Sequence, residues 1–460
     1  MARGKKKETL TPEERLQAAL VPDWEQPYKV PENWCWTKLS SLSNMISKGT
    51  TPKGGKSSYS DNGVKFLRVE NINDDGTISH ENIAYVSEET HKSFLKRSIL
   101  EENDILISIA GTLGKTGIIR NVDLPMNTNQ AVAFVRTVSD KVNVKYIKNS
   151  IDNPVIQDIL LGKTKVTSIP NLTLETIGEC PIPLPPFPEQ QRIVDRIESL
   201  FAKLDEAKQK AQDALDSFET RRAAILHKAF TGELTAQWRK EHGVGMESWA
   251  RHPLKDVTQI GSGGTPSRKN SQYYLGDILW VKTGEIYWNY IYDSEEKITE
   301  EAITNSSAKL YPAGTVLVAM YGQGLTRGRA AILGVPATTN QAVCALQPCD
   351  RLENRYLYYY FMANYWEYRE KAVGGNQPNY SATMIGKWII NIPSVLEQAE
   401  IVRILDDLLA KEQQAKEATE AVLEQIDLIK KSILARAFRG ELGTNDPADE
   451  NAVELLKKII

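Results

Sequence analysis

The 460-residue sequence has few cysteines and no long apolar run, and each absence excludes a class of protein. The cysteines are Cys35, Cys180, Cys344 and Cys349. Their spacing fits neither a disulfide scaffold nor a zinc site. No apolar run approaches the roughly 18 residues that a membrane span requires, and the basic start is not followed by the apolar core of a secretory signal. We therefore expect a cytoplasmic protein with reduced thiols and no attachment to a membrane.

The sequence also lacks a strong net charge and the motifs of common enzymes. Its formal net charge is −3, whereas nucleic-acid-binding proteins are often basic overall. The segment from Gly111 to Thr116 is similar to a phosphate-binding loop, but Ile109 stands where that loop needs a glycine. The segment from Leu184 to Phe187 is similar to an adenine-methyltransferase signature, but leucine cannot hold the adenine amino group. Since the five histidines have no metal spacing either, we expect no catalytic residue, metal or cofactor in this chain.

The dominant feature that is present is a long duplicated segment. Residues Glu189 to Leu234 are similar to residues Glu397 to Leu442, at a constant offset of 208 positions. Prolines precede the first copy, and Gly232 and Gly440 follow the last apolar residues, as expected for the two ends of a helix. Each copy therefore predicts a helix of about 40 residues, roughly 60 Å long.

Apolar residues recur along both copies at alternating steps of four and three, which is typical of a coiled-coil seam. The predicted seam residues are Ile193, Ile197, Leu200, Leu204, Phe218 and Ile225 in the first copy and Ile401, Leu405, Leu408, Val422, Ile426 and Ile433 in the second. Arg221, Glu412 and Thr419 interrupt the pattern. Since a rod with one apolar stripe needs a partner, we expect the two copies to pair; two separate globular helices are the alternative.

The segments before each rod are also related, although more loosely. Trp34 and Trp249 open them, a Gly-x-Thr-Pro motif ends at Pro52 and at Pro266, and a Thr-Asn-Gln-Ala-Val run begins at Thr128 and at Thr339. Short apolar runs alternate with turn residues and are followed by helical patterns at 144–160 and 354–371, which predicts mixed α/β domains. A capping-box pattern at 11–14 predicts a short leading helix.

Together these motifs resemble the specificity subunit of type I restriction–modification systems, from about Pro31 to Leu442. The resemblance is carried by the Trp and Gly-x-Thr-Pro openings, the Asn-Gln-Ala-Val runs, the Glu-Gln-x-x-Ile-Val helix starts and the Ala-Phe-x-Gly-Glu-Leu helix ends, all present twice in order. The second helix start departs from the pattern, with Pro393-Ser-Val-Leu in place of two prolines.

The resemblance implies an α+β fold in which two mixed α/β target-recognition domains alternate with two long, similar α-helices that pair as an antiparallel coiled coil, a pseudo-twofold tandem repeat. The expected parts are an N-terminal extension with a short helix (1–30), recognition domain 1 (31–184), helical spacer 1 (185–240), recognition domain 2 (241–392), helical spacer 2 (393–442) and a C-terminal tail (443–460).

The resemblance also implies a non-catalytic subunit that reads a bipartite, asymmetric site on double-stranded DNA, one half per domain. Its expected partners are two adenine-methyltransferase (modification) subunits, which bind S-adenosylmethionine, and restriction subunits, which use ATP and Mg²⁺. The helices are expected to set the spacing between the half-sites. The alternative is a coiled-coil scaffold that binds proteins rather than DNA, which the mildly acidic composition would also suit.

Candidate DNA-contacting residues lie in polar, glycine-rich loops. Base reading needs side chains with paired donors and acceptors, and phosphate contacts need cations. In the first domain the candidates are Lys48, Thr50, Lys53, Lys56, Tyr59, Arg68, Asn71, Lys115, Lys163 and Lys165. In the second they are Thr265, Ser267, Arg268, Lys269, Lys282, Gln323, Arg327, Arg329, Asn376 and Gln377. The alternative for each is a solvated loop residue, and the near-neutral charge predicts few phosphate contacts and a shallow salt dependence.

Overall fold

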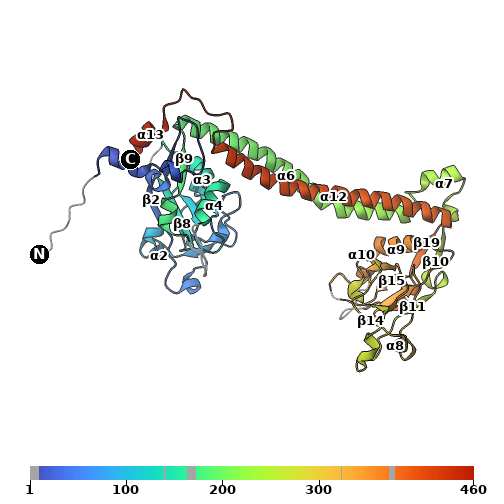
Figure 1. The fold of residues 1–460 in the computed structure, drawn as a ribbon. Helices are drawn as coiled ribbons and strands as arrows, with labels where there is room; N and C mark the ends of the chain where they lie inside the picture. Colours follow the sequence, from blue (N-terminus) through green and yellow to red (C-terminus); the bar gives the residue numbers. More distant parts are fainter. Residues whose placement is uncertain (1–9, 139–140, 163–171, 323, 372–378) are drawn as a thin grey trace. The chain divides into compact units, whose positions relative to one another are not determined.

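The computed structural model describes residues 10–138, 141–162, 172–322, 324–371 and 379–460. They form two compact units (Figure 1): unit 1 is Met1–Lys210 with Val422–Ile460, and unit 2 is Ala211–Ala421. Both unit boundaries fall inside the long helices. Each unit therefore contains one globular domain together with adjoining lengths of both helices.

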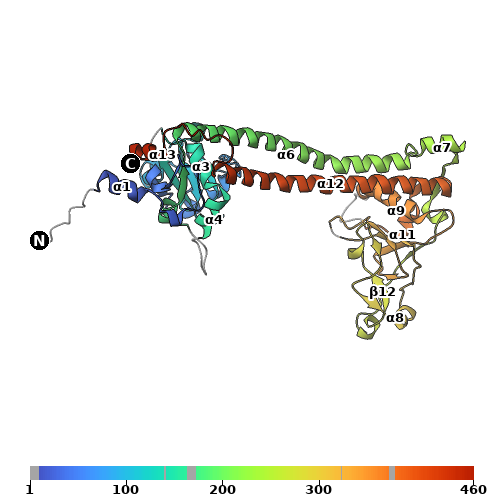
Figure 2. The same cartoon turned by 45° about the horizontal axis from the view of Figure 1, so that its top comes forward.

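The duplicated segment forms two long helices, as predicted. α6 (Phe187–Phe230) has 44 residues and α12 (Val395–Ala437) has 43. They lie side by side and antiparallel (Figures 1 and 2), since Lys430 pairs with Asp205 within unit 1 and Arg221 pairs with Glu412 within unit 2. Because α6 begins before Pro188, this proline lies in the first turn, where its missing N–H costs no hydrogen bond.

Burial along the seam is uneven. Ile193, Ile197, Phe218, Ile401, Leu405 and Ile426 are buried, whereas Leu200, Leu204, Ile225, Leu408 and Ile433 are half-buried. Val422, expected in the seam, is instead 45% exposed. In a pair of helices the partner helix covers only one side of each seam side chain, and solvent reaches the other side. The seam residues are therefore buried mainly where a globular domain packs on the helices as well. The seam interruptions Arg221 and Glu412 pair with each other, Nε to Oε2 at 3.0 Å.

The described residues of the domain in unit 1 form three small sheets. A two-stranded sheet pairs β1 (Cys35–Lys38) with β9 (Pro181–Leu184). A four-stranded antiparallel sheet has the order β2 (Ser43–Lys48), β8 (Val132–Thr137), β5 (Ile105–Ser108) and β6 (Thr116–Ile118). A three-stranded sheet has the order β4 (Ala84–Val86), β3 (Val64–Leu67) and β7 (Met126–Thr128), with β3 and β7 parallel.

The described residues of the domain in unit 2 repeat this plan with one additional strand. β10 (Ala250–Pro253) pairs with β19 (Ile389–Ile392). A five-stranded sheet has the order β11 (Ile260–Ser262), β18 (Val343–Leu346), β15 (Val316–Ala319), β16 (Ala330–Leu333) and β13 (Tyr290–Ile291). The third sheet has the order β14 (Lys297–Ile298), β12 (Ile278–Val281) and β17 (Thr338–Thr339), again with one parallel pair. The predicted duplication of mixed α/β domains is thus confirmed at the level of strand order.

Short helices complete both units. In unit 1 they are α1 (Pro12–Ala19), α2 (Glu88–Lys92), α3 (Val144–Ile151), α4 (Pro154–Gly162), α5 (Leu174–Gly178) and α13 (Ala452–Ile459). In unit 2 they are α7 (Ala236–His242), α8 (Glu300–Thr304), α9 (Asn354–Ala363), α10 (Tyr365–Lys371) and α11 (Ala382–Gly386). The helical patterns expected at 144–160 and 354–371 are each two helices, because Pro154 can only begin a helix and Asn364 ends α9. Thr11 forms the predicted capping box with Glu14.

The two ends of the chain meet in unit 1. α13 packs beside α1, with Leu455 and Leu456 buried, and the backbone N–H of Ala452 donates to the carbonyl of Asn33 at 2.9 Å. The C-terminal tail is therefore part of the core around the globular domain of unit 1. No helix in the described ranges is long and apolar enough to cross a membrane.

Candidate nucleic-acid interface

In each domain the Gly-x-Thr-Pro loop packs against the Thr-Asn-Gln turn, and we call this meeting point the motif corner. It comprises 49–52 with 128–130 in unit 1 and 263–266 with 339–341 in unit 2. In unit 1 the N–H of Thr50 donates to the carbonyl of Thr128 at 3.1 Å, and in unit 2 the N–H of Gly264 donates to that of Thr339 at 2.9 Å. A Cβ on Gly49 would lie 2.1 Å from the carbonyl oxygen of Asn129. The glycine is therefore required by the close approach of the two segments.

Each residue of the Thr-Asn-Gln turn except the glutamine has a structural role. The threonines are fully buried, and Asn129 and Asn340 each accept the backbone N–H two residues on at 3.1 Å. Gln130 and Gln341 are exposed, and Gln341 accepts a hydrogen bond from the Thr265 hydroxyl. An exposed amide can both donate and accept, which suits a DNA contact. These glutamines are not among the candidates expected from the sequence, although their presence in both copies was a signal.

In unit 2 two predicted cations share one carboxylate. Arg268 Nη1 lies 2.5 Å from Glu296, and Lys282 Nζ lies 3.0 Å from Glu296 and 2.8 Å from Glu295. The hydrogen bond from Arg268 is the main reason that the pKa of Glu296 is lowered to about 2, and the bond from Lys282 acts in the same direction. Arg268 also lies over the Tyr274 ring at 4.1 Å, a cation–π contact. The network orients both cations but partly neutralises their charge.

In unit 1 the predicted cations are less connected to one another. Lys48 and Lys53 are exposed. Arg68 pairs with Glu70 at 2.9 Å and Lys115 pairs with Asp74 at 2.8 Å. Asn71 is only 1% exposed, and its side chain accepts the backbone N–H of Arg68. In this structure Asn71 therefore holds the turn after β3 and presents no base-reading surface.

The remaining candidates are dispersed. In unit 1, Thr50 is half-buried and the Tyr59 ring packs on Phe66. In unit 2, the remaining candidates that are exposed are Thr265, Ser267 and Lys269. The guanidinium of Arg327 lies 5.3 Å from the centre of the Tyr380 ring, and that of Arg329 lies 5.0 Å from the centre of the Tyr287 ring. Lys163, Lys165, Gln323, Asn376, Gln377 and the side chain of Lys56 lie outside the described residues. DNA contact by any of these residues stays a prediction. Among the described residues there is no group of three His, Cys, Asp or Glu side chains that could hold a metal.

Each domain is attached to the helix pair by a buried junction built from motifs that are far apart in sequence. In unit 2, Glu397 at the start of α12 accepts hydrogen bonds from Thr235 and Arg239 at 2.7 Å each and from the Trp249 indole at 3.1 Å. Thr235 follows the Gly-Glu-Leu end of the first repeat. The Trp, Glu-Gln and Gly-Glu-Leu motifs therefore converge on one side chain.

Unit 1 has the equivalent junction with different donors. Glu189 at the start of α6 accepts from Thr444 at 2.6 Å and from Arg192, which also contacts Asp449. Burial raises the pKa of Glu189 above its usual value.

The neighbouring glutamine completes each junction in the same way. Gln190 accepts the backbone N–H of Asn143 at 2.9 Å, and Gln398 accepts that of Glu353 at 2.8 Å. Asn143 and Glu353 are the N-cap residues of α3 and α9. A domain helix is thereby fixed to the start of each long helix.

Comparison with known proteins agrees with this architecture. Residues 31–215 and 246–425 match the family model for the type I restriction modification DNA specificity domain. The chain is 33% identical over 216 residues to the EcoBI specificity subunit of Escherichia coli, covering 46% of this chain and 44%, less than half, of that relative. It is 23% identical over 462 residues to the EcoKI specificity subunit of Escherichia coli K12, covering 94% of this chain and 96% of the relative.

A solved structure shares the fold. The HsdS subunit from Thermoanaerobacter tengcongensis superposes with a TM-score of 0.62 at 19% identity, covering 91% of this chain and all of that one. The curated relatives are named specificity subunits, in agreement with the expectation of a chain that is not itself an enzyme. Since the family model matches both domains and most of the chain, the chain belongs to the type I restriction–modification DNA specificity family.

Proposed function

We propose that each globular domain reads one half of a bipartite, asymmetric site on double-stranded DNA. The observation that carries this proposal is the motif corner, which recurs in the same place in two domains whose surrounding side chains differ. In unit 1 the residues beside the motif corner include the exposed Lys48 and Lys53. In unit 2 they include Arg268 and Lys282, which both pair with the Glu296 carboxylate. A shared frame with different neighbouring donors and acceptors suits two different half-sites.

The helix pair would set the spacing between half-sites and dock two adenine-methyltransferase subunits. Repeat-related surfaces on the two helices allow two copies of one partner to bind through similar contacts. The buried junctions support the spacing role, because they tie each domain to the helices through hydrogen bonds. Restriction subunits would join the same complex.

The proposed chemistry belongs to the partners. S-adenosylmethionine would be bound by the modification subunits, which act on an adenine extruded from the duplex, and ATP with Mg²⁺ would be used by the restriction subunits. The role of this chain is to choose where they act.

A genome-wide map of methylated adenine, in cells with and without the gene, tests the proposal. Loss of methylation at one split, asymmetric motif on deletion is the expected result, and it would identify both half-sites. If an active partner methyltransferase is present and no motif loses its methylation, the chain is a scaffold that binds proteins rather than DNA.

A further inference from the structure

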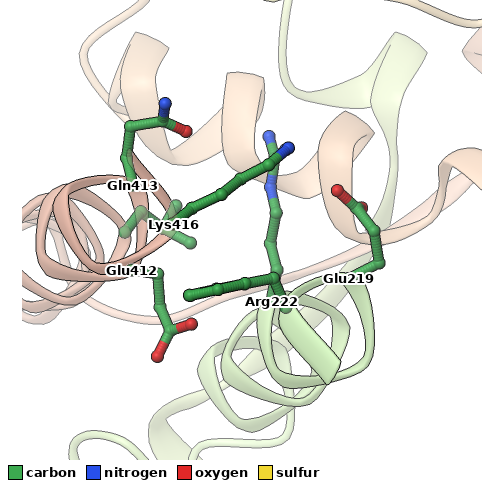
Figure 3. A pocket seen from close by; sticks show the side chains of 7 residues that line it. Glu219, Arg222, Glu412, Gln413 and Lys416 are labelled. Atoms are coloured by element: carbon green, nitrogen blue, oxygen red, sulfur yellow. The ribbon is translucent and has the colours of Figure 1, made fainter. Parts of the chain in front are cut away.

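A pocket of about 150 Å³ lies between α6 and α12 within unit 2 (Figure 3). It is lined by Phe218, Glu219, Arg222, Leu409, Glu412, Gln413 and Lys416. Figure 3 shows the side chains of Arg222 from α6 and Lys416 from α12 extending to one side of the pocket, whereas the Glu412 carboxylate turns to the other. Glu219 extends to the same side as the two cations, so this side of the pocket carries two positive charges and one negative charge.

These two cations have no carboxylate partner in the part of the chain that the structure describes. Glu412 is already paired with Arg221 at 3.0 Å. The Arg222 guanidinium lies 3.1 Å from the thioether of Met362, which is a weak acceptor. Since Glu219 is the one lining carboxylate outside a described ion pair, the pocket has a surplus of positive charge.

The repeat supplies an internal comparison, because the same surface exists in unit 1 with its charges balanced. There Lys430 pairs with Asp205 at 2.5 Å, and Lys208 pairs with Asp427 at 3.6 Å. The repeat offset of 208 positions relates these four residues to the pocket of unit 2. It relates Lys430 to Arg222 and Asp205 to Gln413, and it relates Lys208 to Lys416 and Asp427 to Glu219. The decisive difference is that Gln413 in unit 2 stands where unit 1 has Asp205, because a neutral amide supplies no negative charge to pair with a cation.

We propose that the pocket in unit 2 binds an acidic side chain of a partner protein, which supplies the carboxylate that Asp205 supplies in unit 1. The repeat-related surface of unit 1 is closed by its own ion pairs, so of the two docked partner subunits only the one on unit 2 would make this additional contact. This inference rests on the proposed function for the identity of the partner, the modification methyltransferase.

The lining favours a single protein carboxylate over the DNA backbone. Phe218 and Leu409 offer apolar surface to the methylene stem of a Glu or Asp side chain, and Gln413 can donate to its oxygens. Glu219 and Glu412 also line the pocket. They would repel the closely spaced charges of a duplex more than one carboxylate placed between the cations.

The sharpest test is Gln413→Asp in the full-length chain, because it recreates the closed arrangement of unit 1 without removing a cation. We expect affinity for the modification methyltransferase, measured by titration at low salt, to fall roughly tenfold. Arg222→Gln and Lys416→Gln should weaken binding similarly and reduce its salt dependence. The matched controls Lys430→Gln and Lys208→Gln should leave the affinity near wild type, and circular dichroism should show the same helix content throughout.

The outcomes separate the possibilities. Wild-type affinity in Gln413→Asp, or equal losses in the unit 1 controls, would overturn the proposal. Normal assembly with a loss of affinity for a non-specific DNA duplex would make the occupant a phosphate and overturn it as well. If the wild-type chain binds no methyltransferase, the proposed function fails, and titration with a glutamate-rich helical peptide decides the pocket: weaker binding by Gln413→Asp supports it, and equal binding overturns it.

Discussion

At the scale of single residues, the two junction glutamates show how a shared motif can be maintained by different neighbours. Glu189 and Glu397 are both fully buried and both accept a threonine hydroxyl from the segment that follows the other long helix. Their arginine partners differ. Arg239 is 9% exposed in its side chain, whereas Arg192 is 37% exposed and has Asp449 as a second partner. Loss of the glutamate should therefore cost unit 2 more than unit 1.

Glu397→Ala leaves the Arg239 guanidinium buried, and its remaining hydrogen-bond acceptors among the described residues, the Thr235 hydroxyl and the Gly232 carbonyl, are neutral. Removing one member of a buried ion pair costs about 3 kcal/mol or more, so we expect a loss of this size in the free energy of unfolding, measured by urea titration. Glu189→Ala is the matched control, and it should cost about 1 kcal/mol, close to the loss of a hydrogen bond, because Asp449 still pairs with Arg192. Equal losses would contradict this account of the junctions.

The lowered pKa of Glu296 predicts that the stability of unit 2 depends on pH. This pKa is about 2 in the folded chain, lowered chiefly by the hydrogen bond from Arg268. A carboxyl whose pKa is depressed by folding adds stability above its unfolded pKa of about 4.3 and loses it as the pH falls through the folded value. Stability should therefore decline between about pH 5 and pH 2 more steeply in the wild type than in Glu296→Gln, as measured by urea midpoints. Parallel curves would argue against a persistent Arg268–Glu296 pair.

At the scale of elements, the long helices were predictable because their signals are local and repeated. Alternating apolar steps, prolines at the start and glycines after the end place α6 and α12 within a few residues of their observed bounds. The ion-pair partners of the polar residues that interrupt the seam were not predictable. The apolar pattern of one helix does not show which of its residues lies opposite a given residue of the other helix. The Arg221–Glu412 pair appears only when the helices are placed together.

The globular domains were predictable as mixed α/β segments but not in strand order. β2 pairs with β8 and β3 pairs with β7, and these contacts join runs far apart in the chain. For the candidate site, Arg268 and Lys282 were identified, but their shared partner Glu296 and the exposed Gln130 and Gln341 were not. A site for an anion gives no reason to expect a carboxylate such as Glu296. The apolar residues that follow Gln130 and Gln341 have the pattern of a strand, which does not distinguish an exposed turn residue at its start.

The C-terminal tail predicts an effect confined to one unit. Deletion of residues 443–460 removes α13 with its buried Leu455 and Leu456, and also the Thr444 donor to Glu189. We expect amide hydrogen exchange in unit 1 to accelerate while exchange in unit 2 stays unchanged. Protection retained in both units would show that the tail is dispensable to the core.

At the scale of the whole molecule, the chain repeats one fold plan twice, but the exposed charged side chains of the two copies differ. The strand orders, junction motifs and motif corners recur. The cations near the motif corners and the charges along the helix pair do not. Similar frames with dissimilar surfaces are what a protein needs if its two domains are to recognise different targets at a fixed separation.

Exchange of one domain tests that reading directly. Residues 31–184 join the rest of unit 1 through the junction at Glu189 and Gln190, so a related domain that keeps the Trp and Gly-x-Thr-Pro motifs should fit the same frame. In cells that carry the exchanged chain, the methylated-adenine motif should change in one half and keep its other half and its spacing. Exchange of 241–392 is the reciprocal control and should alter the opposite half. A change in both halves after either exchange would mean that the domains do not read DNA independently, because each would then depend on contacts that the other supplies.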